Sequence, residues 1–130
     1  MATKEDVIAY RLKKVAIDLE AAHAALSAIE NWTGAVNRLY YAAFHAVSAL
    51  LHQHTITVNS HGGAKAMFEL HFVKEGLVER KWSKFYTNLF ESRNESDYED
   101  FVILNADDVL PLLPQTAEFI ELIKGLINKS

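Results

Sequence analysis

Apolar residues recur at three- and four-residue steps along most of this chain, which is the pattern of amphipathic helices. The first such stretch runs from about Glu5 to Glu30. The residues predicted to face inward are Val7, Tyr10, Leu12, Val15, Leu19, Ala22, Leu26 and Ile29. Those predicted to face solvent are Lys13, Lys14, Asp18 and Glu20. Thr3 followed by Asp6 is typical of a capped helix start.

The second predicted helix, from about Gly34 to His54, is apolar or small on nearly every face. The stretch 31–34 breaks the first pattern, and Thr33 is suited to cap this second helix. A helix with so little polar surface is usually the buried centre of a bundle. Its few polar residues fall at three- and four-residue steps and share one stripe. They are Arg38, Tyr41, His45 and Ser48.

Three further helices are predicted over about 64–74, 79–95 and 105–128. Ser60 and Asn105 are suited to cap two of them, and Gly76 to end the first. In that first helix the inward residues are predicted to be Met67, Leu70, Phe72 and Val73.

Pro111 and Pro114 predict a kink or a late start in the last helix. No run of alternating strands is visible, so we expect an all-α fold. It is an antiparallel bundle of four to five helices in a single domain spanning 1–130.

The composition excludes several classes of protein. The chain of 130 residues has no cysteine, so disulfides and thiolate metal sites are ruled out. Its net charge of −4 means that any RNA contact must be local. The start of the chain does not resemble a signal peptide, and no apolar run approaches the length of a membrane span. We expect a cytoplasmic protein without membrane contact, metal or cofactor.

Arg38 and His45 are the first candidates for chemistry. They lie two helical turns apart on one stripe, with Tyr41 between them. A guanidinium suits phosphate, and a neutral imidazole can take a proton near neutral pH. The alternative is that both side chains are paired internally to carboxylates or backbone carbonyls. The spacing is compatible with either interpretation.

The second candidate segment lies at the end of the fourth predicted helix, over 91–100. Asp97 is one turn after Arg93, so an intrahelical ion pair is the simplest interpretation. Tyr98 could stack on a base or cover the core. The six histidines show no pairing typical of a zinc helix, so no metal site is predicted.

Several segments together resemble the small stand-alone HEPN domains of prokaryotes. They are Asn37-Arg38-Leu39-Tyr40-Tyr41-Ala42-Ala43-Phe44-His45-Ala46, Ser60-His61-Gly62-Gly63 with Phe68, Phe72-Val73-Lys74-Glu75-Gly76, and Arg93-Asn94-Glu95-Ser96-Asp97-Tyr98. The resemblance implies a helical bundle that forms a two-fold homodimer. It also implies association with RNA or a nucleotide, often as partner of a minimal nucleotidyltransferase in a toxin–antitoxin pair.

Active members of that family are metal-independent RNases with an Arg, often followed by Asn, and a His a few residues later. The matching segment here begins Arg93-Asn94 and has Tyr98 where the His is expected. An unperturbed Tyr titrates near about pH 10 and is a poor base at neutral pH. The RNase motif is therefore degenerate.

The sequence thus supports three hypotheses. The first is a HEPN-like module that binds RNA, a nucleotide or a nucleotidyltransferase. Its candidate ligand-binding residues are Arg93, Asn94, Asp97, Arg38, Tyr41 and His45. The second is an endoribonuclease that uses Arg93 with Tyr98, or borrows Arg38 and His45. The third is a structural dimeric domain in which the polar residues only satisfy one another.

Overall fold

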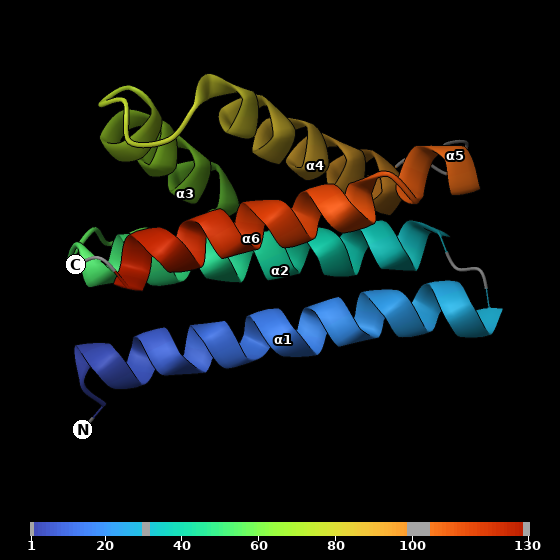
Figure 1. Ribbon diagram of the computed structural model, residues 1–130, viewed down its shortest axis with the longest axis horizontal. Coiled ribbons are helices and arrows are strands. Elements are labelled where there is room, and N and C mark those ends of the chain that lie inside the picture. The colour runs from blue at the N-terminus through green and yellow to red at the C-terminus, as the bar shows by residue number, and fades with distance from the viewer. Residues whose placement is uncertain (1, 30–31, 99–104, 129–130) are drawn as a thin grey trace.

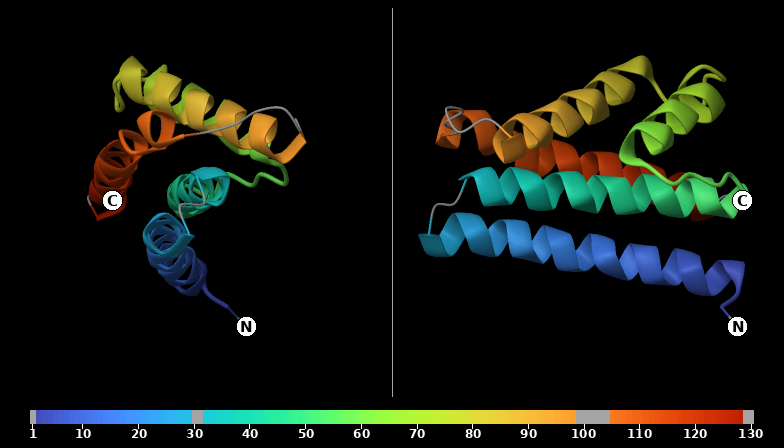
Figure 2. Two further views of the ribbon diagram at one scale, coloured as in Figure 1. Left: turned by 90° about the vertical axis from the view of Figure 1, so that its right-hand side faces the viewer. Right: turned by 180° about the vertical axis from the view of Figure 1, so that it is seen from behind.

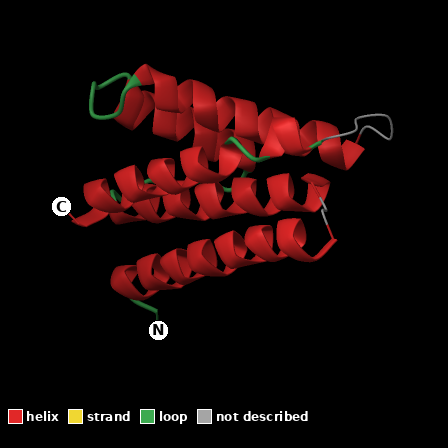
Figure 3. Cartoon of the chain, turned by 45° about the vertical axis from the view of Figure 1, so that its right-hand side comes forward, coloured by secondary structure: helices red, strands yellow, loops and turns green. Residues whose placement is uncertain are grey.

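Helices make up the bulk of this molecule (Figures 1 and 3). The computed structural model describes the backbone of residues 2–29, 32–98 and 105–128, and their side chains apart from those of 27–29 and 93–98. Within these ranges there is no strand. The α-helices are α1 (Lys4–Ile29), α2 (Trp32–Gln53), α3 (His61–Phe68), α4 (Arg80–Tyr98), α5 (Ala106–Val109) and α6 (Leu112–Asn128). The predicted all-α bundle is confirmed.

Helix α2 lies at the centre of the bundle, as its apolar pattern predicts. An end-on view shows α1 on one side of α2 and α4 with α6 on the other (Figure 2). Five buried alanines on α2 leave little side-chain volume between the helices, so neighbours can approach closely. They are Ala35, Ala42, Ala43, Ala46 and Ala49.

Helix α1 packs chiefly along α2, so much of its circumference faces away from the bundle (Figure 2). Tyr10 was predicted to face inward but is 57% exposed. A helix with one main neighbour buries a narrow stripe, and the periodicity of its apolar residues overstates how wide that stripe is. Val15 and Ala22, by contrast, are fully buried as predicted.

Aromatic rings fill the space between α3, α4 and α6. The Phe119 ring stacks on Tyr86 at 5.7 Å between centroids and meets Phe68 edge-on at 5.9 Å. Tyr40 joins this cluster to α2 by stacking on Tyr86 at 6.1 Å. Burial of Tyr86, with Tyr40 beside it, raises the pKa of the Tyr86 phenol well above its ordinary value.

Local sequence signals explain where several helices begin. Thr3 and Asp6 exchange side-chain and backbone hydrogen bonds of 3.0 and 3.1 Å at the start of α1. Ser60 Oγ accepts from the Gly63 N–H at 2.9 Å, and Asn105 forms a capping box with Asp108. Helix α2 is the exception. It begins at Trp32, so Thr33 lies inside the helix instead of capping it.

Helix α3 continues directly into a π-helical segment, Glu69–Val73. A π-helical hydrogen bond spans five residues instead of the four of an α-helix, so the segment rotates the side chains beyond it. Phe72 and Val73 are buried as predicted, whereas Leu70 is 43% exposed. Gly76 takes the left-handed φ of 81° in the turn after this segment.

The last predicted helix is divided where its prolines lie. Helix α5 ends at Val109, and α6 begins at Leu112, directly after Pro111. Pro114 occupies the first turn of α6, where no intrahelical N–H bond is required. The prolines thus interrupt the predicted helix between α5 and α6, where a kink or a late start was expected. None of the described helices combines the length and the apolar character needed to cross a membrane.

Candidate functional site

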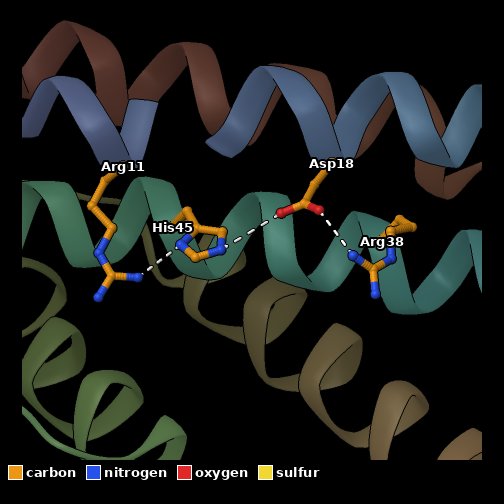
Figure 4. A network of polar contacts seen from close by, with 4 residues as sticks. All are labelled: Arg11, Asp18, Arg38 and His45. Atoms are coloured by element: carbon orange, nitrogen blue, oxygen red, sulfur yellow. Dashed lines mark hydrogen bonds and ion pairs between the residues drawn. The ribbon is translucent and has the colours of Figure 1, made fainter. Parts of the chain in front are cut away.

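The polar stripe of α2 faces α1, and the two helices share a chain of four polar side chains (Figure 4). Arg38 Nη1 lies 3.1 Å from one carboxylate oxygen of Asp18. His45 Nε2 lies 3.6 Å from the other oxygen. Arg11 Nη1 lies 2.8 Å from His45 Nδ1. Arg38 and His45 are thus held by one carboxylate, as the internal-pairing interpretation expects.

Asp18 corrects a prediction, because its periodicity placed it on the solvent side of the first helix. The residue is only 5% exposed. A buried carboxylate is costly unless it is paired, and here the Arg38 guanidinium supplies the charge. The Arg38 side chain itself is 46% exposed, so the pair sits at the edge of the core with one end in water.

His45 has a defined hydrogen-bonding role. A guanidinium only donates, so Nδ1 of His45 accepts from Arg11, and the ring proton belongs on Nε2, facing Asp18. Burial and the nearby Arg11 lower the pKa of His45 to about 4, despite the opposing effect of Asp18. The imidazole is therefore neutral at pH 7, and its contact with Asp18 is a polar contact between a neutral ring and a carboxylate.

Tyr41 extends the site along the surface of α2. Its ring lies 5.6 Å from the Arg38 guanidinium carbon and 5.6 Å, edge-on, from the ring of His61 at the start of α3. His61 Nδ1 in turn lies 2.7 Å from the Tyr40 hydroxyl. A cation, an aromatic face and an imidazole therefore lie in succession on this side of the molecule.

The second candidate segment lies at the carboxyl end of α4. The backbone of Arg93, Asn94, Asp97 and Tyr98 belongs to that helix, but their side chains lie outside the described residues. The second and fourth helices are in contact, since the Phe90 ring lies 5.6 Å from Tyr40. Helix α4 therefore passes α2 beside Tyr40 and leads on toward the start of α2 (Figure 1).

Arg11 and Asp18 were not recognised as site residues from the sequence. A usable signal was present, because they are seven positions apart on α1, as Arg38 and His45 are on α2. In antiparallel helices, two polar pairs with equal spacing can meet in reverse order. Among the residues that the structure describes, no group of three or more His, Asp or Glu side chains could hold a metal ion.

Comparison with known proteins points to one family. The family model described as HEPN domain matches residues 8–126. A Thermotoga maritima protein named "UPF0332 protein" is 35% identical over 128 residues, covering 98% of this chain and 96% of that protein.

Two proteins of Methanocaldococcus jannaschii are also similar. "Putative toxin MJ0142" is 28% identical over 86% of this chain and 81% of its own length. "Putative toxin MJ0605" is 39% identical over 49% of this chain and 48% of its own length.

Proposed function

Because the chain belongs to the HEPN domain family, we propose that it is the RNA-binding, toxin-like member of a toxin–antitoxin pair. The names of the two Methanocaldococcus jannaschii relatives support the toxin-like assignment. The proposed RNA site is the face of α2 that carries Arg38 and Tyr41, continued by Arg93 on α4. The homodimer, the nucleotidyltransferase partner and a cytoplasmic location remain predictions from the sequence.

The observation that carries this proposal is the way Arg38 is held. Asp18 fixes one side of the guanidinium from the buried side, while nearly half of the side chain faces solvent. The Tyr41 ring lies beside it. A pre-oriented guanidinium can bind a phosphate in bidentate fashion, and an aromatic ring next to it can stack on an unpaired base. Such a local site is compatible with the net charge of −4.

The endoribonuclease hypothesis meets an obstacle at His45. A general base needs a free acceptor nitrogen, and Nδ1 already accepts from Arg11. His45 would become a base for a bound RNA only if Arg11 moved away. We therefore assign His45 a positioning role and favour RNA binding over cleavage.

The test measures binding of a fluorescent single-stranded RNA by anisotropy. We expect Arg38→Gln and Arg93→Ala each to weaken binding by about tenfold, since each removes a charge-assisted phosphate contact. Arg80→Gln is the matched control. It removes another arginine that pairs with a carboxylate, Glu69 at 3.3 Å, and should leave the affinity unchanged.

Two results would overturn the proposal: no saturable RNA binding by the wild-type protein, or equal affinities for all three variants. RNA cleavage in EDTA that is lost in His45→Ala would instead favour the endoribonuclease hypothesis. Thermal melting of each variant separates a loss of binding from a loss of folding.

A further inference from the structure

Helix α1 has a second face that the rest of the bundle leaves uncovered. It packs along α2 on one side, and its other side lies at the outer edge of the molecule (Figure 2). Five residues on that outer side are exposed: Tyr10, Lys13, Ile17, Glu20 and Ala24. They recur at alternating steps of three and four, so they form one continuous stripe about 21 Å long, here called the α1 outer stripe.

The α1 outer stripe carries apolar side chains that the fold itself does not use. Tyr10 is 57% exposed and Ile17 is 49% exposed. They are two of the five large apolar side chains that are exposed among the described residues, and they lie two turns apart on one face of one helix. A single exposed apolar residue needs no explanation, whereas several on one face mark a contact surface.

The two charged residues of the stripe are an independent indication of a missing partner. Within the described part of the chain, neither Lys13 nor Glu20 takes part in an ion pair. Lys13 lies four positions before Ile17, and Glu20 lies three positions after it. Seven helical steps of about 100° return to within about 20° of the same direction. The two charges therefore lie along one edge of the stripe, while Tyr10 and Ile17 lie along the other.

This arrangement is complementary to itself. Tyr10 lies seven positions before Ile17, and Ala24 lies seven positions after it. When two copies of α1 pack antiparallel about a two-fold axis at Ile17, each Tyr10 stands opposite the partner's Ala24, a large side chain against a small one. Each edge of the stripe then meets the same edge of the other copy, so Lys13 lies next to the partner's Glu20. A parallel pair would instead place like charges side by side.

We propose that the α1 outer stripe is a contact surface for a second copy of this chain, with the two α1 helices antiparallel and Ile17 at the two-fold axis. The resemblance to HEPN domains implies a homodimer, but it does not say which surface forms it. One pair of helices buries less than the ~1,600 Å² of a standard interface, so we expect a dissociation constant on the order of micromolar. The inference does not depend on the proposed function, because the RNA site uses Arg38 and Arg93 instead.

The test measures self-association of the full-length protein by sedimentation velocity, from low micromolar to several hundred micromolar concentration. Ile17→Glu places two carboxylates against each other at the axis and should weaken the association by about tenfold or more. Leu110→Glu is the matched control. Leu110 is 48% exposed and lies outside α1, so the same substitution there should leave the association unchanged. Thermal melting checks that each variant folds.

A charge exchange tests the antiparallel orientation. At low salt, Lys13→Glu and Glu20→Lys should each weaken the association by several-fold, because each sets like charges against each other at both symmetric contacts. In a mixture of the two variants, a heterodimer has opposite charges at both contacts, so the mixture should associate more strongly than either variant alone. The two positions are about 10 Å apart along α1, so this rescue cannot arise within one chain.

The proposal is overturned if the wild-type protein stays monomeric at several hundred micromolar. It is also overturned if the Ile17→Glu and Leu110→Glu proteins associate equally well, since any association then uses another surface. Failure of the mixed charge variants to associate more strongly than either alone overturns the antiparallel contact. If another surface forms a dimer as well, the α1 contact should join two such dimers, and Ile17→Glu should halve the mass of the largest species.

Discussion

The two sides of α2 are stabilised in different ways. On one side, α4 and α6 cover it with a cluster of buried aromatic rings around Phe119 and Tyr86. On the other, α1 lies along it with a buried carboxylate and two arginines at the contact (Figure 4). The aromatic side is stabilised by the burial of apolar surface. The α1 side gives up part of that stabilisation, because it holds oriented charged groups at the contact instead. The proposed RNA site takes Arg38 from this α1 side, where Asp18 holds it.

The largest effect is expected from the aromatic side. Phe119→Ala removes a fully buried ring that contacts Phe68, Trp82 and Tyr86. Loss of its contacts and the resulting cavity should lower the free energy of unfolding by about 3–5 kcal/mol. Urea denaturation followed by circular dichroism measures the change. A loss below about 1 kcal/mol would mean that the ring cluster does not hold this side together.

A smaller effect is expected where α1 meets α2. Asp18→Asn removes the charge opposite Arg38, which can then be solvated through its exposed half. We expect a loss of about 1–2 kcal/mol, less than for a fully buried ion pair. A double-mutant cycle with Arg38→Gln isolates the pair, and the exposed Arg80–Glu69 pair serves as comparison, at below about 1 kcal/mol. Equal coupling energies for the two pairs would contradict the distinction drawn between them.

At neutral pH the smallest effect is expected from the protonation of His45, because it changes the stability only below about pH 6.5. Its pKa is lowered to about 4, against about 6.5 for an unfolded His, so the unfolded chain takes up this proton first. The stability that the neutral ring contributes is complete above pH 6.5 and declines as the pH falls from there toward 4. Titration by NMR gives the pKa directly. Arg11→Gln should raise it, because a nearby positive charge is removed, and an unchanged value would show that Arg11 does not act on the ring.

Much of the fold is determined by local sequence. The caps at Thr3, Ser60 and Asn105 and the interruption at Pro111 depend on backbone chemistry within one turn, and each appears where the sequence places it. Leu70 shows the limit of this reasoning. Its predicted inward position assumed an unbroken α-helical period, and the π-helical segment altered the rotation.

The candidate site was predictable only in part. Arg38, Tyr41 and His45 share a stripe, as their spacing indicates, and the chemistry of each comes from its residue type. Their partners were missed, because Asp18 and Arg11 reach them from another helix. Periodicity defines the direction of a side chain around its own helix axis, but it does not define which residue of a neighbouring helix stands opposite.

By itself, the sequence determined the helices, the burial of α2 and the polar stripe along it, since these depend on composition and spacing within single segments. Only the tertiary structure decided that Asp18 is buried against Arg38, and that Arg11 occupies the acceptor nitrogen of His45. It also brought α1, α2 and the 56–60 segment together around a cavity that Arg11 helps to line. The physical reason is docking register. Sliding one helix by a single turn, about 5.4 Å, would leave every segment unchanged and exchange all of these partners.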